Sequence, residues 1–289
     1  MNTPISFPLY CKRVLMVSPE YFDIEYAINP FMLDKEGNLN KVDRPLADWQ
    51  WNNLKKTFET LGLTVEVLTG IKGFPDMVFC ANQCFPFLHP KTKNPTAVIS
   101  HMRSSFRQGE VIYFENWLKE NGYDVLRLED KDLHFESNGD LVPHPGTNLF
   151  WGGYGQRTEK GVYEELHQRF GLEIATLEHV QPQFYHLDTR FATQSQETVA
   201  LVKESLSTES LRKIESLVRN VIFIPIEEAS RTFAGNAFCP DSKNIVVEKG
   251  AADFTKQAEI LGFKVHEVET SEFRKSGGSV FCLKLALPN

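Results

Sequence analysis

Residues able to do nucleophilic chemistry recur at similar distances behind the ends of amphipathic segments. Glu136 lies 14 residues after Gly122, His186 lies 15 after Gly171, and Cys282 lies 20 after Gly262. The same intervals place Asp76 and Asn82 14 and 20 residues after Gly62, and Asn236 16 after Asn220. A cysteine, a histidine and carboxylates in one small space are the parts of a cysteine-nucleophile site, in which imidazole moves the proton and a carboxylate orients it.

Each of these residues alone also has an ordinary structural explanation. Cys282 stands among Val, Phe and Leu, as many inert core cysteines do, although the preceding Gly-Gly-Ser favours close approach of a ligand. His186 equally suits a turn, and Glu136 a solvated carboxylate. Cys80 and Cys84 have no second close pair of Cys or His, which argues against zinc, and we predict no metal site. The shared interval is therefore the stronger argument for catalysis.

Five amphipathic helices are predicted, and each ends at a residue that tolerates a left-handed backbone. A short β-rich run follows each end at once. The helices are expected at about 45–61, 109–121, 159–170, 208–219 and 250–261, with ends at Gly62, Gly122, Gly171, Asn220 and Gly262. Five such units, at spacings of 60, 49, 49 and 42 residues, indicate an internal structural repeat.

A loop and one or two short strands precede each helix, so every unit reads as hairpin, helix, strand. The hairpins are expected in 135–151, 233–247 and 280–286. The N-terminal strand Lys12–Ser18 has no unit of its own, and we expect it to pair with the C-terminal strand. Pattern alone supports equally a closed five-unit ring, which leaves few sheet edges, and an open α/β sheet.

Composition narrows the class of protein. The chain has 289 residues, a hydrophobic fraction of 42%, a charged fraction of 24% and a net charge of −7. Those values predict a globular protein that binds neither nucleic acid nor membrane. The five scattered cysteines and the lack of a visible export signal predict a reduced, cytoplasmic protein. No linker divides the chain, so we expect one domain over residues 1–289, and a homo-oligomer is left open.

Six motifs resemble those of guanidine-modifying enzymes with the pentein fold. They are PDMVFCANQ, FESNGD, GGYGQRT, FYHLDTRFA, FAGNAFCP and GGSVFCL, which together cover nearly the whole chain. This superfamily includes arginine deiminases, dimethylarginine dimethylaminohydrolases and amidinotransferases. The resemblance implies a single-domain, pseudo-fivefold α/β propeller of five units. YAINPFM and the asparagine of CANQ resemble the arginine dihydrolase branch.

The resemblance also implies a role for each matching residue. Cys282 matches the nucleophile, His186 the general acid/base and Glu136 its acidic partner. The substrate-binding residues that it implies are Asp188 and Asp76 for the guanidinium, Asn82 where deiminases carry a carboxylate, Arg157 and Arg107 for the substrate α-carboxylate, and Asn29. Arg190 departs from the pattern, because a small or apolar residue is expected there.

The function implied is hydrolysis of a free guanidino compound, with arginine the first choice and no cofactor. A covalent thiouronium on Cys282 would release one ammonia, and a second round would give ornithine and CO2. Three alternatives stay open. A deiminase or dimethylarginine hydrolase would stop at citrulline, an amidinotransferase would pass the amidino group to an amine, and a non-catalytic protein of the same fold would need no Cys/His pair.

Overall fold

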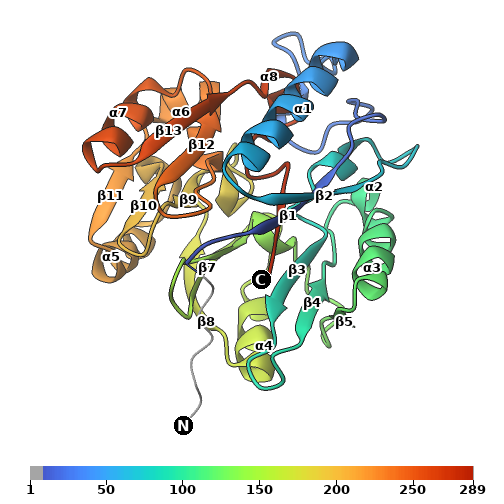
Figure 1. Ribbon diagram of the computed structural model, residues 1–289, viewed down its shortest axis with the longest axis vertical. Helices are drawn as coiled ribbons and strands as arrows, with labels where there is room; N and C mark the ends of the chain where they lie inside the picture. The colour runs from blue at the N-terminus through green and yellow to red at the C-terminus, as the bar shows by residue number, and fades with distance from the viewer. Residues whose placement is uncertain (1–8, 289) are drawn as a thin grey trace.

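Five amphipathic helices form where the sequence predicts them. The computed structural model describes residues 9–288, so both ends of the predicted domain 1–289 and the start of the segment searched for an export signal lie outside the described residues. The five helices are α1 (Arg44–Thr60), α3 (Val111–Glu120), α4 (Gly161–Phe170), α5 (Thr208–Leu217) and α7 (Ala252–Ile260). They lie around the outside of the molecule, with the strands toward its middle (Figure 1).

The strands form five small sheets rather than one open sheet. Four are three-stranded, with orders β14-β1-β2, β3-β4-β5, β6-β7-β8 and β9-β10-β11, and the fifth pairs β12 with β13. Their bounds are β1 (Arg13–Val17), β2 (Thr64–Leu68), β3 (Cys84–Leu88), β4 (Pro95–Ile99), β5 (Asp124–Leu126), β6 (Leu141–Pro143), β7 (Leu149–Tyr154), β8 (Glu173–Glu178), β9 (Phe191–Thr193), β10 (Thr198–Leu201), β11 (Asn220–Phe223), β12 (Asn244–Glu248), β13 (Lys264–Val268) and β14 (Leu285–Leu287).

One strand arrangement recurs in all five sheets. The central strand of each three-stranded sheet is antiparallel to one neighbour and parallel to the strand that follows the helix. The fifth sheet has the parallel pair, and an isolated antiparallel bridge between Phe238 and Val246 stands for its third strand. The predicted unit of hairpin, helix and strand is therefore confirmed around α3, α4, α5 and α7. The hairpin expected in 280–286 was wrong, because the strand there, β14, begins at Leu285 and pairs with β1 instead of a local partner.

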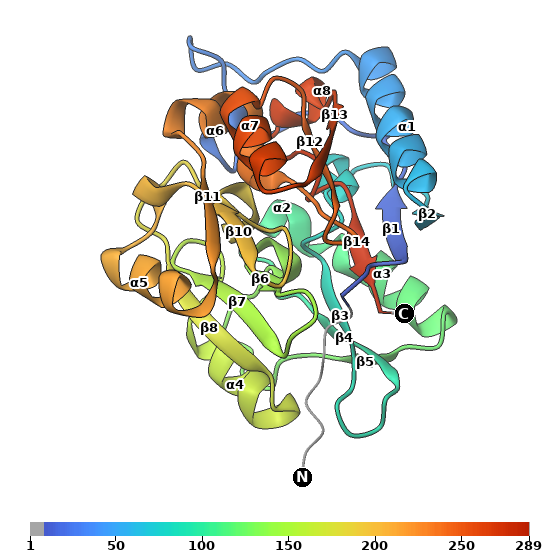
Figure 2. The same cartoon turned by 60° about the vertical axis from the view of Figure 1, so that its left-hand side comes forward.

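The two ends of the described chain meet in one sheet. β1 pairs antiparallel with β14, with Val14 opposite Ala286, as predicted for the N-terminal strand (Figure 2). The unit built on β1 thus takes its first strand from the C-terminal end of the chain. This pairing brings the segment that carries Cys282, which directly precedes β14, into the middle of the molecule.

Four of the five predicted helix ends adopt the left-handed backbone and one does not. Gly62, Gly122, Gly171 and Gly262 have φ between +69° and +89°. The prediction for Asn220 was wrong, because α5 ends at Leu217 and the chain is already extended at Val218. Asn220 instead opens β11 opposite Thr198. The helices α2 (Ser105–Gln108), α6 (Ile226–Thr232) and α8 (Ser271–Arg274) were not predicted, being too short for a hydrophobic period.

Short 3-10 turns lead into the first strand of four units. They are η2 (Pro75–Val78), η3 (Ser137–Gly139), η4 (Leu187–Thr189) and η6 (Ala234–Asn236), and η4 packs against both η3 and η6. Ser137, the first residue of η3, and Phe233, directly before η6, have φ of +46° and +52°, which is strained for residues other than glycine. Polar residues in equivalent turns of different units are in this way brought together.

Candidate active site

The residues predicted from their shared spacing and from the family resemblance meet at one cavity, whose empty volume of about 300 Å³ includes space open to solvent. Seven of the nine predicted site residues line it: Asn29, Asp76, Asn82, Arg107, Arg157, His186 and Cys282. The other two, Glu136 and Asp188, lie directly behind the lining and bond to His186 and Cys282. The sequence intervals and the resemblance therefore located one site in space, whereas the role of each residue stays a prediction.

The thiol of Cys282 is held between two polar side chains. Its Sγ lies 3.1 Å from Oδ2 of Asp188 and 3.1 Å from Nδ2 of Asn236. The amide oxygen of Asn236 accepts from the backbone N–H groups of Ser279, Phe281 and Cys282. Asn236 thus fixes both the backbone and the sulfur of the cysteine-bearing segment.

Burial favours the protonated form of the Cys282 thiol. Burial and the neighbouring Asp188 charge raise the pKa of the Cys282 thiol well above its usual value. Burial likewise raises the pKa of Asp188 to about 7, although the hydrogen bond from Cys282 opposes that shift. The thiol of Cys282 donates a hydrogen bond to the carboxylate of Asp188. A cation placed beside the two groups would favour the charged form of both.

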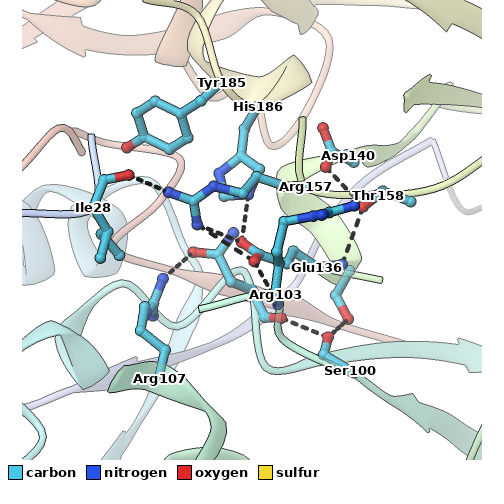
Figure 3. Close-up of polar contacts among 12 residues, drawn as sticks. Ile28, Ser100, Arg103, Arg107, Glu136, Asp140, Arg157, Thr158, Tyr185 and His186 are labelled. Carbon is cyan, nitrogen blue, oxygen red and sulfur yellow. Dashed lines mark hydrogen bonds and ion pairs between the residues drawn. The ribbon is translucent and has the colours of Figure 1, made fainter. Parts of the chain in front are cut away.

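His186 forms an ion-pair network with Glu136 and Arg157 (Figure 3). Nε2 of His186 lies 2.7 Å from Oε2 of Glu136, and Nη1 of Arg157 lies 3.2 Å from the same oxygen. Burial alone would raise the pKa of Glu136, but the Arg157 charge and the His186 hydrogen bond outweigh it and hold that pKa well below its usual range. Glu136 is therefore a carboxylate that can orient the imidazole.

Asp140 supports this network from behind. It accepts from the backbone N–H of Leu187 at 3.0 Å and from the hydroxyl of Thr158 at 2.7 Å. Thr158 in turn accepts from the backbone N–H of Glu136 at 3.1 Å. Asp140 thus links the segment that bears Glu136 to the turn after His186, and burial raises its pKa to about 6.

Two carboxylates each present one oxygen without a partner among the described residues. Oδ1 of Asp76 accepts from the hydroxyl of Ser276 at 2.9 Å, while its Oδ2 is buried and unbonded. Oδ1 of Asp188 is likewise buried and unbonded. Unbonded buried carboxylate oxygens are costly unless a donor arrives. A planar cation with several N–H groups, such as guanidinium, supplies such donors.

The amide of Asn82 is fixed with its nitrogen unbonded. Its Oδ1 accepts from Nη1 of Arg107 at 3.0 Å, while its Nδ2 has no partner within the described residues. A Cβ added to Gly139 would lie 2.4 Å from this nitrogen and 3.2 Å from the ring of His186. The glycine of FESNGD therefore lets the Asn82 amide and His186 lie close together.

The guanidinium of Arg107 is hydrogen-bonded within the protein. Its guanidinium bonds to Glu110 at 2.9–3.2 Å and to the backbone carbonyls of Asp76 and Phe79 at 3.0 and 3.1 Å. Together with its bond to Asn82, these contacts leave few free N–H groups. The structure thus places Arg107 as a support for the turn of Asp76 and for Asn82, besides lining the cavity.

The segment between β1 and α1 closes one side of the cavity. Arg157 donates from Nη2 to the backbone carbonyl of Ile28 at 2.8 Å, and it lies over the ring of Tyr185. Asn29 donates to the carbonyl of Ser276 at 2.9 Å. Gly277, with φ of +90°, has no room for a Cβ because Asn29 and Tyr185 lie within 3 Å of that position. These contacts tie the segment to the cavity wall.

Arg190 does not line the cavity. Its side chain is fully buried, and it donates to the carbonyls of His186 at 3.2 Å and Ser205 at 2.9 Å. Burial lowers the pKa of Arg190 to about 9. This arginine therefore holds the backbone of His186 from the core, which explains its departure from the family pattern without a role in closing the pocket.

Three contributors to the site were not among the predicted site residues. Asn236 shares the sequence interval but carried no assigned role, so the repeat was the signal that could have found it. Tyr185, which donates to the carbonyl of Gly277 at 2.6 Å, directly precedes His186. Ser276 sits in the glycine-rich run before Cys282, where nothing in the sequence indicated its bond to Asp76.

The part of the chain that the structure describes contains neither a metal-binding cluster nor a membrane-spanning helix. Residues 9–288 contain no group of three or more His, Cys, Asp or Glu side chains placed to hold a metal ion. Their helices include none with the length and apolarity needed to cross a bilayer.

The fold and the buried Cys, His and carboxylate set match the guanidine-modifying enzymes that the motifs resemble. The chain belongs to the family described as N,N dimethylarginine dimethylhydrolase, eukaryotic, whose sequence model matches residues 18–287. The predicted resemblance is thereby confirmed.

Similar proteins fall in two activity groups. The chain is 35% identical over 275 residues to the bifunctional arginine dihydrolase/ornithine cyclodeaminase AgrE of Nostoc sp., matching 94% of this chain and 37% of AgrE. It is 33% identical to the dimethylarginine dimethylaminohydrolase of Mycobacterium tuberculosis, over 96% of this chain and 86% of that protein. The chain therefore spans little more than a third of AgrE.

A solved structure shows which part of such a protein the chain resembles. The substrate-bound N-terminal domain of ArgZ, a cyanobacterial arginine dihydrolase, has a TM-score of 0.88 at 32% identity. The match covers 96% of this chain and 98% of that domain.

Proposed function

We propose that this chain hydrolyses the guanidinium group of L-arginine through a covalent intermediate on Cys282. The observation that carries this proposal is the cavity at which the thiol, the His186–Glu136 pair and unbonded oxygens of Asp76 and Asp188 meet. A guanidinium cation satisfies both carboxylates at once.

Substrate binding itself prepares the nucleophile. The cation placed beside Asp188 lowers the free energy of both the Asp188 carboxylate and the Cys282 thiolate, whose pKa values are raised by burial. The Cys282 thiol gives up its proton, which His186 takes up, and the thiolate forms a bond to the guanidinium carbon. His186 donates a proton to the departing amino nitrogen, ammonia leaves, and a thiouronium remains on the sulfur.

Water completes the first cycle. His186, now neutral, takes a proton from a water molecule, and the hydroxide attacks the thiouronium carbon. The carbon–sulfur bond breaks, the new hydroxyl group loses its proton to solvent, and the Cys282 thiolate and a neutral ureido product remain. Glu136 keeps Nε2 of His186 oriented through both proton transfers, since its carboxylate is held ionised by Arg157.

We propose that the ureido product is hydrolysed a second time. The neutral ureido group gains little from a second carboxylate, but its oxygen can accept from an amide N–H. Asn82 presents such a nitrogen, with its oxygen fixed by Arg107. The product then stays bound for a second attack by Cys282, which yields ornithine, CO2 and a second ammonia. The arginine dihydrolases AgrE and ArgZ among the similar proteins support this reading.

A second candidate activity is hydrolysis of dimethylarginine to citrulline and dimethylamine. The family description and the similarity to the mycobacterial enzyme favour it. The same Cys282 chemistry would serve, with dimethylamine in place of ammonia as the leaving group.

We also propose that Arg157 binds the substrate α-carboxylate. Arg157, which donates a hydrogen bond to the backbone carbonyl of Ile28, releases that bond and binds the substrate α-carboxylate instead.

We propose in addition that the chain forms a five-unit pseudo-fivefold propeller, a single catalytic domain over residues 1–289. The recurring strand order of the sheets and the β1–β14 pairing support this proposal. Cytoplasmic location, independence of cofactors and the oligomeric state stay predictions.

Product analysis with purified protein tests the proposal. L-arginine and asymmetric dimethylarginine are incubated separately, and amino-acid chromatography is combined with counts of ammonia and dimethylamine. We expect ornithine and two ammonia molecules per arginine. Citrulline with one ammonia would assign a deiminase, and turnover of dimethylarginine alone would assign the second candidate. An amidino group recovered on an added amine would instead show a transferase. No product from either substrate would reject the hydrolase.

A further inference from the structure

A second hollow lies on the other side of the segment that carries the nucleophile. Its empty volume of about 450 Å³ includes space open to solvent, and it shares no lining residue with the catalytic cavity. Phe281 and Lys284 line this hollow, whereas Cys282, between them in sequence, lines the catalytic cavity. Its remaining wall is mostly apolar and includes Leu9, Pro143, Pro145, Pro240, Phe238 and Ala286.

The only Lys or Arg side chain lining this hollow, among the residues described, is Lys284. The side chain is fully buried, and its Nζ has no hydrogen-bond partner within the described part of the chain. Nζ lies 3.1 Å from the ring centroid of Phe281 and 4.6 Å from that of Phe238. Ring faces attract a cation but accept none of its hydrogen bonds as a carboxylate would. The ammonium therefore lacks an anionic acceptor.

The charged and titratable groups around Lys284 do not supply that acceptor. Asp188, Cys11, Cys80 and Cys282 act on it through space, yet burial outweighs them and lowers the pKa of Lys284 to about 8. Near neutral pH the amine is largely protonated, in a hollow whose wall can pack against an apolar ligand but cannot neutralise the charge.

We propose that this hollow binds a small monocarboxylate. Its carboxylate accepts hydrogen bonds from Nζ of Lys284, and its short apolar tail packs against the prolines and phenylalanines of the wall. A dianionic phosphate fits worse, because it needs several donors and Oδ1 of Asn138, a second unbonded buried atom in the lining, is an acceptor. The site is separate from the catalytic cavity and does not depend on the proposed activity.

Butyrate is a suitable probe, and isothermal titration of the wild-type protein at pH 7 measures its binding. Lys284→Met removes the charge at similar volume, so we expect butyrate to bind at least about tenfold more weakly. Butyramide, uncharged and of the same shape, should bind weakly to the wild type. Two controls should bind butyrate as the wild type does: Lys256→Met, an exposed lysine on α7, and Arg157→Lys, at the catalytic cavity.

Lysine-selective NMR of the wild-type protein gives a measurement that needs no variant. Saturating butyrate should raise the titration midpoint of the buried lysine, because a bound carboxylate favours the ammonium. Several results would overturn the proposal: no binding of butyrate, equal binding of butyramide, binding lost in Arg157→Lys but kept in Lys284→Met, or an unmoved midpoint.

Discussion

At the scale of single residues, the surroundings of Cys282 favour the neutral thiol. Asp188 accepts its hydrogen bond, and burial opposes ionisation of both groups. A buried thiol of this kind resists oxidation and alkylation until a cation enters. Cys80, another buried cysteine, instead donates from its Sγ to the backbone carbonyl of Leu15.

Replacing the nucleophile should abolish turnover. Cys282→Ser keeps a donor for Asp188 but supplies an oxygen that does not ionise near neutral pH, so we expect kcat to fall by at least about 10³-fold. The matched control is Cys80→Ala, a buried cysteine outside the cavity, which should keep most of its activity. Ammonia release under saturating arginine measures both. Wild-type kcat in Cys282→Ser would reject the covalent mechanism.

Arginine affinity should depend on the charge of Asp188. Because its pKa is raised to about 7 by burial, the carboxylate is protonated as pH falls through that value and loses its attraction for guanidinium. In inactive Cys282→Ser we expect affinity for arginine to fall about tenfold from pH 8 to pH 6. Calorimetry of Cys282→Ser with and without Asp188→Asn checks this. An equal slope in the double variant would assign the pH dependence elsewhere.

Asn82→Asp should change the product rather than stop the reaction. A carboxylate beside Arg107 still accepts its hydrogen bond, but it no longer offers the N–H that we assign to the ureido oxygen. We expect the ratio of citrulline to ornithine to rise by at least about tenfold, with about one ammonia per arginine. Amino-acid chromatography gives the ratio, and an unchanged ornithine yield would contradict the role of Asn82.

The identities of the site residues could be predicted from sequence, but their hydrogen bonds could not. The intervals behind the helix ends placed Glu136, His186 and Cys282 in equivalent turns, since equivalent units carry equivalent turns to the same place. Nothing in the sequence showed that Arg107 forms an ion pair with Glu110 or that Arg157 forms one with Glu136. Such pairings depend on side-chain directions set by tertiary packing.

At the scale of elements, the segment between β1 and α1 is held over the cavity by side chains rather than by regular structure. Asn29 and Asn40 both bond from this segment to the residues before Cys282: Asn29 to the carbonyl of Ser276 and Asn40 to that of Lys275. Only Asn29 also lines the cavity. The two asparagines therefore separate the anchoring of the segment from the shape of the site.

Asn29→Ala should weaken substrate binding, with Asn40→Ala as its matched control. Each variant loses side-chain hydrogen bonds, so we expect each to lose about 1 kcal/mol of unfolding free energy. Only Asn29→Ala should raise the KM for arginine, by about tenfold, because only that residue touches the cavity. Steady-state kinetics and urea unfolding measure the two effects. An equal rise of KM in Asn40→Ala would show that anchoring alone matters.

Element prediction succeeded where a local signal was strong. Helix α1 begins at Asp43, whose side chain accepts from the N–H of Leu46, and it ends before Gly62 with φ of +86°. Asn220 was misread because asparagine suits a left-handed end and a strand start alike, and its pairing with Thr198 decided between them. Helix α8, of four residues, has no period to read.

At the scale of the whole molecule, acidic and basic side chains are buried together where the repeated units meet. Asp76, Glu136 and Asp188 lie at most 2% exposed, and Arg107 and Lys284 at most 4%. Burying a charged group lowers the free energy of unfolding unless the group is paired. One carboxylate oxygen of Asp76 and one of Asp188 have no hydrogen-bond partner among the described residues. These unpaired groups lower the stability of the fold, and they are the same groups that can bind a ligand.

Lys284 gives the clearest measurement of that cost. Its folded pKa, about 8, lies below the ordinary value of 10.5, so its contribution to stability is complete above pH 10.5 and is lost as pH falls through about 8. At pH 7 the buried ammonium should therefore destabilise the fold, and Lys284→Met should raise the unfolding free energy by about 2–3 kcal/mol. At pH 10 the gain should shrink to about 1 kcal/mol, because the folded lysine is then almost entirely neutral and the unfolded chain is itself close to its titration midpoint of 10.5. Urea unfolding at the two pH values checks this, with exposed Lys256→Met as a control that should show no such difference. A Lys284→Met protein less stable than wild type at pH 7 would mean that the two phenylalanine rings compensate the charge fully, and the ammonium would then have no unmet need for an anion.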